Sequence, residues 1–170
     1  MTKINFQNLP NTTTPVNATN LNQLQTNVEN AINQKDMITI ALSSNCNCTT
    51  IGSYTKVTGF YQYNRYGTRL SFNDNQVVIG AGVSRVKISG RFGWYATTGS
   101  IKYGRIRKNS NGLIWSTTNV PSGAYLADCF SEFLVDVQEG DTISMTYYTE
   151  QSGDSLQDNM RTYITVEVLI

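Results

Sequence analysis

The sequence predicts an all-β fold: a two-sheet antiparallel sandwich preceded by a short N-terminal helix. From Met37 onward, apolar and polar residues alternate within segments of strand length, the pattern of half-buried strands. The preceding residues are rich in asparagine, threonine and glutamine and contain one short apolar stripe of helical period. A chain of 170 residues accommodates one domain of about 130 residues and an appendage. We therefore expect an extended anchor segment plus a short amphipathic helix over residues 1–36 and a β-domain over residues 37–170.

The predicted helix carries its apolar residues on one side. Asn17 is a suitable N-cap, and the segment before it should be extended, because residues that precede proline avoid the helical region. Spacings of three and four residues relate Leu21, Leu24, Val28 and Ile32. A helix this short is marginal in water, so its stripe needs a partner surface. That surface is either the β-domain of the same chain or, as we favour, other subunits or a host particle, which makes the stripe a candidate anchoring and oligomerisation site.

Two segments show the strand pattern most clearly. In the segment 85–94, one face is apolar and consists of Val86, Ile88, Phe92 and Trp94. The last strand has an apolar face of Ile164, Val166, Val168 and Ile170, and its other face is partly apolar, which favours a position inside a sheet. Further candidate strands lie near residues 37–42, 54–63, 69–79, 100–107 and 113–118. The resulting total of about eight to ten strands is typical of a two-sheet sandwich.

A strand, a turn and a second strand follow one another near the C-terminus. The first strand directs Phe133, Val135 and Val137 to one face, and the second does the same with Ile143, Met145 and Tyr147. Gly140 and Asp141 lie between them and are typical turn residues. We predict a β-hairpin over this stretch.

The composition argues against most enzyme classes. Histidine is absent, which excludes Ser/His/Asp and Cys/His nucleophile arrangements and Cys/His zinc sites. Cys46 and Cys48 are too close together for the usual four-ligand zinc pattern and Cys129 is distant, so we expect structural thiols, with a redox or metal role as the alternative. The acids fall at predicted turns, although hydrolysis by a pair of carboxylates about 5 to 10 Å apart stays formally open. We expect no enzymatic activity, no cofactor and no bound metal.

The net charge and the hydropathy of the chain restrict the classes of partner that it can bind. A net charge of +1 and a pI near 7.6 argue against a dedicated nucleic-acid binder, which would carry a basic excess. No segment of about 20 apolar residues and no signal-peptide pattern occurs, so we expect neither a membrane-spanning nor a signal-peptide-exported protein. Charged residues make up only 15%, which suits a surface of amides and hydroxyls in a large static assembly.

Two clusters could carry binding. The first combines aromatic rings with a guanidinium, a mixture that can stack on sugars, and consists of Tyr61, Tyr63, Arg65 and Tyr66. Strand alternation would turn half of these rings inward, so we favour packing in the core or at an oligomer axis. The second is a basic hairpin arm that could meet anionic cell-wall polymers, formed by Lys102, Arg105, Arg107 and Lys108. A solvated strand face is the simpler interpretation of this arm.

Three stretches resemble a known superfamily. Val83–Phe92, Phe133–Met145 and Thr162–Leu169 are similar to strands of the trimeric jelly rolls of the complement globular-head and tumour-necrosis-factor superfamily. In that family a strand, a Gly-Asp turn, a second strand and a buried C-terminal strand recur in this order. The resemblance covers about 120 residues and implies a jelly-roll domain and a homotrimer.

The N-terminal stretch carries a second resemblance. Thr14–Asn22 is similar to the T-P-x-N-A-x-N-L-N segment of tailed-bacteriophage appendage proteins, where it precedes a helix and a variable β-rich module. The resemblance implies a virion appendage. Because the chain lacks a shaft, we expect a short head fibre, decoration protein or tail-associated spike, not the main tail fibre.

In this interpretation the protein is assembled in the host cytoplasm and lies on the particle exterior. Residues 1–36 would bind other virion proteins, and the trimeric β-domain would be free to contact host cell-wall glycan. The alternatives are a free-standing lectin-like glycan-binding module and, less favoured, a carboxylate-based glycan hydrolase.

Overall fold

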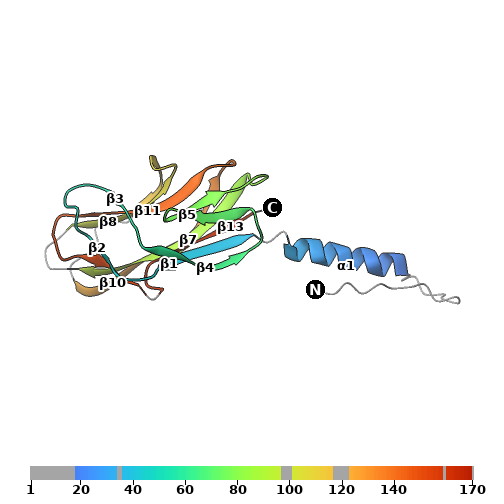
Figure 1. Cartoon of the computed structure of the whole chain (residues 1–170), viewed down its shortest axis with the longest axis horizontal. Helices are drawn as coiled ribbons and strands as arrows, with labels where there is room; N and C mark the ends of the chain where they lie inside the picture. Colours follow the sequence, from blue (N-terminus) through green and yellow to red (C-terminus); the bar gives the residue numbers. More distant parts are fainter. Residues whose placement is uncertain (1–17, 34–35, 97–100, 117–122, 159, 170) are drawn as a thin grey trace. The chain divides into compact units, whose positions relative to one another are not determined.

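The computed structural model describes residues 18–33, 36–96, 101–116, 123–158 and 160–169 (Figure 1). The chain divides into two compact units, Met1–Lys35 and Asp36–Ile170. The described part of the first unit is one helix, α1, over Ala18–Asn33, in agreement with the predicted helix. No described helix is long and apolar enough to span a bilayer.

The second unit consists of two antiparallel sheets that enclose one core. Sheet A has the order β2-β12-β7-β13-β1-β4, with β10 also paired to β7, and sheet B has the order β5-β6-β11-β8-β9, with β3 also paired to β11. The strands of sheet A are β1 (Met37–Leu42), β2 (Cys46–Asn47), β4 (Phe60–Tyr66), β7 (Arg85–Ala96), β10 (Gly123–Asp136), β12 (Ser155–Leu156) and β13 (Tyr163–Val168). The strands of sheet B are β3 (Thr55–Lys56), β5 (Leu70–Asn73), β6 (Gln76–Ile79), β8 (Lys102–Lys108), β9 (Gly112–Ser116) and β11 (Thr142–Thr149).

The core forms where the apolar faces of the two sheets meet. The predicted inward residues of β7 and β13 that the structure describes are buried, which confirms both strands; they are Val86, Ile88, Phe92, Trp94, Ile164, Val166 and Val168. Ile170, the remaining residue of the predicted face, lies outside the described residues. Because β13 pairs with both β1 and β7, the last strand lies inside sheet A as predicted. Phe92 of sheet A stacks on Trp115 of β9 with ring centroids 6.1 Å apart, so aromatic rings fill the space between the sheets.

The predicted hairpin near the C-terminus is wrong. β10 pairs with β7 in sheet A, whereas β11 pairs with β3, β6 and β8 in sheet B. The turn at Gly140 and Asp141 therefore carries the chain from one sheet to the other. Alternation requires only that both strands direct apolar side chains inward, and a connection between facing sheets satisfies this as well as a hairpin does.

A hairpin instead lies within the segment 69–79, predicted as a single strand. β5 and β6 pair with each other, and Asp74 and Asn75 connect them with φ angles of 45° and 60°. Two successive left-handed residues are the requirement of a tight hairpin turn, and Asn and Asp tolerate this conformation better than most residues.

Asp36, immediately before β1, is fixed to the turn that joins β4 and β5. Its side chain is buried, with Arg69 N donating a hydrogen bond to Oδ1 at 2.9 Å and Arg69 Nε to Oδ2 at 2.5 Å. Val168 N donates to the Asp36 backbone oxygen at 2.8 Å. Gly67 has φ +74°, and a Cβ there would lie 1.8 Å from Asp36 Oδ1, so only glycine fits beside this carboxylate. These contacts make Asp36 part of the β-domain.

Candidate binding surfaces

The aromatic cluster lies on β4, at the edge of sheet A. Phe60 is buried, but Tyr61, Tyr63 and Tyr66 are 41%, 52% and 59% exposed. The expectation that half of these rings turn into the core is therefore wrong for the three tyrosines. An edge strand has no neighbour to cover them, and a register shift between Thr39 and Ile40 interrupts the alternation. Packing at an oligomer axis stays a prediction.

Arg65 lies on the same strand and is exposed. Its Nη2 donates a hydrogen bond to the backbone oxygen of Thr68 at 3.1 Å. The Tyr61 and Tyr63 rings lie nearly perpendicular to each other, with centroids 6.3 Å apart. The β4 residues of the predicted cluster thus share one exposed edge of the molecule, where a partner could reach them.

The outer face of sheet A combines hydroxyls, charges and unsatisfied polar atoms. The Thr39 and Thr165 hydroxyls are hydrogen-bonded across β1 and β13 at 2.8 Å, and Leu134 of β10 is 61% exposed. Asn64 Oδ1 and Arg91 Nε are buried atoms with no hydrogen-bond partner in the described residues. A buried polar atom without a partner is unusual in a folded protein, so this face is suited to a contact beyond the single chain.

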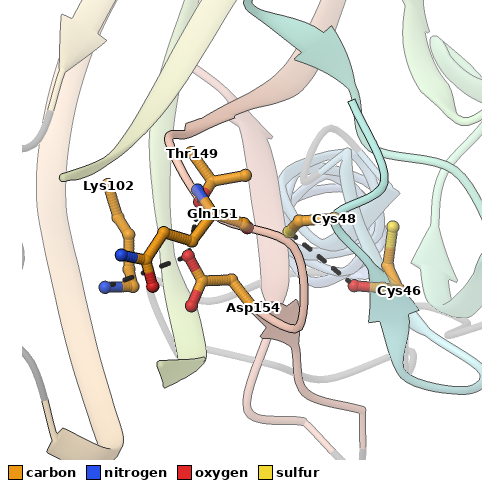
Figure 2. Close-up of polar contacts among 6 residues, drawn as sticks. All are labelled: Cys46, Cys48, Lys102, Thr149, Gln151 and Asp154. Carbon is orange, nitrogen blue, oxygen red and sulfur yellow. Dashed lines mark hydrogen bonds and ion pairs between the residues drawn. The ribbon is translucent and has the colours of Figure 1, made fainter. Parts of the chain in front are cut away.

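Lys102 does not belong to an exposed basic arm, which corrects that prediction. Alternation along β8 directs Tyr103, Arg105 and Arg107 outward and Lys102 inward, where its side chain is 0% exposed. Lys102 Nζ lies 3.9 Å from Asp154 Oδ2, and the Asp154 side chain is also fully buried. Figure 2 shows the two side chains facing each other beside Thr149, whose hydroxyl donates a hydrogen bond to Asp154 Oδ2. This pair stabilises the interior and presents no charge to solvent.

Lys108 has a structural partner as well. Its Nζ lies 3.0 Å from Asp141 Oδ2 and donates to the Asp136 backbone oxygen at 2.9 Å. Burial alone would raise the pKa of Asp141, but hydrogen bonds from Asn109, from the Gln138 backbone and from Lys108 outweigh it and hold that pKa below its ordinary value. The Lys108 charge is therefore paired with Asp141 at the turn between β10 and β11.

The remaining two cations of the arm lie over an aromatic group on the outer face of sheet B. The Arg105 Cζ is 3.5 Å from the centroid of the Tyr54 ring, and the Arg107 Cζ is 5.5 Å from it. Tyr148 of β11 lies against both Tyr54 and Tyr103, with ring centroids 5.3 and 5.8 Å apart. Sequence reasoning missed the three tyrosines, because strand alternation assigns a residue to a face but does not tell which strands are neighbours.

A hollow of about 320 Å³ opens beside Arg107 on this face. Its lining comes from β3, β8, β11 and the β8–β9 turn and consists of Tyr54, Lys56, Arg107, Ser110, Asn111, Ser144 and Thr146. We call it the sheet B hollow. It unites cations, hydroxyls and an amide at one open site.

The two cysteines whose side chains are described, Cys46 and Cys48, have the properties of structural thiols. Cys46 is half-buried and Cys48 buried, both are free thiols, and burial is the main reason that the pKa of each is raised. A raised pKa leaves little thiolate and hence little reactivity. Cys48 Sγ points to the Cys46 backbone oxygen at 3.9 Å (Figure 2). The described residues contain no group of three or more Cys, Asp or Glu placed to hold a metal, and the Cys129 side chain lies outside them.

The helical stripe is only partly described. In α1, Leu21 is half-buried, whereas Leu24 and Val28 are 60% and 49% exposed. The side chain of Ile32 and the first 17 residues, including most of the predicted anchor segment, lie outside the described residues. Anchoring through this stripe stays a prediction.

No protein-family model and no curated protein matches the chain. Among solved structures, that of murine APRIL at pH 5.0 aligns with a TM-score of 0.62 and 14% identity, over 79% of this chain and 99% of that one. Two further crystal structures of murine APRIL, at pH 8.0 and pH 8.5, align over the same shares of both chains with TM-scores of 0.59 and 0.58 and 13% identity. The β-domain is a tumour-necrosis-factor-like jelly roll. The predicted fold is thus confirmed, and at this level of identity the likeness concerns the fold alone.

The jelly roll keeps the two candidate surfaces apart. The β4 tyrosines border sheet A, whereas the sheet B hollow lies on the outer face of the opposite sheet. The core separates the two sheets. A contact made through sheet A would therefore leave the sheet B hollow open to a ligand.

Proposed function

We propose that the chain is a non-enzymatic structural appendage of a tailed-bacteriophage virion: a short head fibre, a decoration protein or a tail-associated spike. Residues 1–35 attach it to other virion proteins, and the jelly roll assembles as a homotrimer on the particle exterior. The observation that carries the proposal is the division of the chain. The first unit contains a helix and the Thr14–Asn22 segment, which resembles a segment of phage appendage proteins, and the second unit is a tumour-necrosis-factor-like jelly roll.

The outer face and edge of sheet A support self-association. The exposed rings of Tyr61, Tyr63 and Tyr66 offer apolar area that a neighbouring subunit would remove from water. Asn64 Oδ1 and Arg91 Nε are buried in the single chain without partners among the described residues, and a second subunit could supply them. Closed symmetry is the usual state of such assemblies, and the resemblance to trimeric jelly rolls favours a threefold axis.

The carboxylates support a structural role. Three carboxylates form ion pairs within the β-domain: Asp36 with Arg69, Asp141 with Lys108 and Asp154 with Lys102. Each carboxylate stabilises a turn or the interior, so none needs a catalytic role to explain its position. The second candidate, a lectin-like glycan-binding module, is favoured by the sheet B hollow alone.

Removal of residues 1–35 should abolish attachment without unfolding the jelly roll. We expect the truncated chain, which keeps Asp36, to be soluble and to melt cooperatively, because the core residues all lie in the second unit. Purified virions should contain the full chain by mass spectrometry and lack the truncated one.

A matched pair of variants separates the stripe from the rest of the helix. Leu24→Ala with Val28→Ala should reduce incorporation, whereas Gln23→Ala with Asn27→Ala, on the polar side of α1, should not. Virions without the full chain, or equal incorporation of the truncated chain, would contradict the proposal.

A further inference from the structure

The sheet B hollow holds positive charge that the protein itself does not neutralise. Within the described part of the chain, neither Arg105 nor Arg107 forms an ion pair with a carboxylate. Two acids of this part of the molecule have other partners: Asp74 lies 3.0 Å from Lys56 Nζ, and Glu150 accepts a hydrogen bond from the Tyr148 hydroxyl at 3.3 Å. Two guanidiniums on neighbouring outward positions of β8 therefore face solvent without a counter-charge.

The Arg107 guanidinium is held in a fixed orientation. Its Nε donates to the Thr146 hydroxyl at 3.3 Å, and its Nη1 lies 3.3 and 3.4 Å from the backbone oxygens of Ser110 and Asn111. Arg105 lies flat against the Tyr54 ring, and its Nε is buried with no hydrogen-bond partner in the described residues. A guanidinium that is oriented in advance and carries unused N–H donors is suited to bind a carboxylate or phosphate.

The size and lining of the hollow restrict the class of ligand that can bind there. Its volume of about 320 Å³ lies near the lower end of ligand sites, about 300–1,000 Å³. The Ser110 hydroxyl and the Asn111 amide are exposed at the hollow and can bind sugar hydroxyls. A nucleic acid would need a track of cations for successive phosphates, whereas the lining of this hollow has two cations, Lys56 and Arg107, of which Lys56 is paired with Asp74.

We propose that the sheet B hollow binds one acidic saccharide unit of a glycan polymer, with Arg107 contacting its carboxylate or phosphate. The exposed Ser110 hydroxyl and Asn111 amide bind the hydroxyls of the sugar. This proposal extends the proposed function, in which the β-domain contacts host cell-wall glycan. It rests on that function only for the assumption that the glycan comes from the host surface. Binding is a property of the purified protein, so it can fail or succeed independently of virion attachment.

Titration calorimetry on the full-length protein tests the site. The probes are phosphomannan, which is a glycan that carries phosphate, polygalacturonic acid, inorganic phosphate and neutral dextran. We expect one or both acidic polymers to bind, with an affinity that falls as salt rises, and dextran not to bind. Binding of the phosphate polymer alone or of the uronate polymer alone identifies the acidic group. Competition by inorganic phosphate would support phosphate as that group.

Arg107→Gln should weaken binding about tenfold or more, and Arg107→Lys should be intermediate, because lysine keeps the charge but loses the planar pair of donors. Lys56→Gln, across the hollow, should also weaken binding and provides a second variant if Arg107→Gln is unstable. The matched control is Arg85→Gln, which removes the same charge from an exposed position on sheet A.

Any of three results with the polymers would overturn the proposal. Dextran could bind as tightly as the acidic polymers, or neither acidic polymer could bind at low ionic strength. Arg85→Gln could also lower the affinity as much as Arg107→Gln does. Equal affinity for a duplex DNA oligonucleotide would also overturn it, since that result indicates nonspecific attraction of polyanions. The mass of the assembly and the incorporation into virions are measured separately, so either proposal can fail alone.

Discussion

Replacement of Lys102 by Met should lower the free energy of unfolding by about 3–5 kcal/mol, which is the usual effect of breaking a buried ion pair. Both side chains of the Lys102–Asp154 pair are 0% exposed, so the Asp154 charge would stay buried after its cation is removed. Methionine keeps most of the volume of the lysine stem. The decrease in the free energy of unfolding therefore reflects the unpaired charge of Asp154 and not a cavity. Urea denaturation followed by circular dichroism measures it.

Two further variants identify the cause. Lys56→Met, which breaks the exposed pair with Asp74, should change stability by less than about 1 kcal/mol. Combining Lys102→Met with Asp154→Leu should recover much of the loss, since no unpaired charge would remain in the core. If Lys102→Met is as stable as the parent, the pair does not contribute as described.

Asp36→Ala should lower the free energy of unfolding by about 2–3 kcal/mol. The substitution removes a buried carboxylate that accepts hydrogen bonds from both the backbone and the side chain of Arg69. It also disconnects the start of β1 from the turn that contains Gly67. Arg69 is partly exposed and can regain water, which keeps the effect below that of Lys102→Met.

In the parent protein, acid should remove the stabilisation that the Asp36 carboxylate provides. Burial alone would raise the pKa of Asp36, but the hydrogen bonds and the charge of Arg69 outweigh it, so the folded pKa lies below the ordinary value of 3.8. The unfolded chain then binds protons more readily. The contribution is therefore complete above about pH 4 and is lost as the pH falls through the folded pKa.

Denaturation curves between pH 7 and pH 2 should show a smaller acid loss for Asp36→Ala than for the parent. Glu139→Ala removes an exposed carboxylate and provides the control. A parent and an Asp36→Ala variant with parallel pH profiles would contradict the assignment.

Much of the fold could be predicted, because a strand that faces a core records its inward residues in the sequence. Val86, Ile88 and Ile164 are buried as the alternation requires. The same rule applied to β8 separates Lys102 from Arg105 and Arg107, although the four cations were predicted as one arm. The error lay in reading the charges as a run without regard to the faces of the strand.

Strand pairing could not be derived in this way. The turn at Gly140 and Asp141 connects two sheets, because apolar alternation is the same for a hairpin and for a crossing between facing sheets. The sheet B hollow depends on the pairing of β11 with β3 and β8, which brings Tyr54 and Arg107 together from distant parts of the chain. Arg107 was visible in the sequence as a candidate, but Tyr54 and the hydroxyls of the lining were not recognisable as its neighbours.

Light scattering on the purified full-length protein tests the proposed appendage most directly, because a homotrimeric β-domain is its central claim. We expect a mass near three times 18.9 kDa at micromolar concentration. The exposed tyrosines of β4 and the unsatisfied atoms of sheet A should then be covered by neighbouring subunits. A single species of 18.9 kDa at that concentration would contradict the trimer.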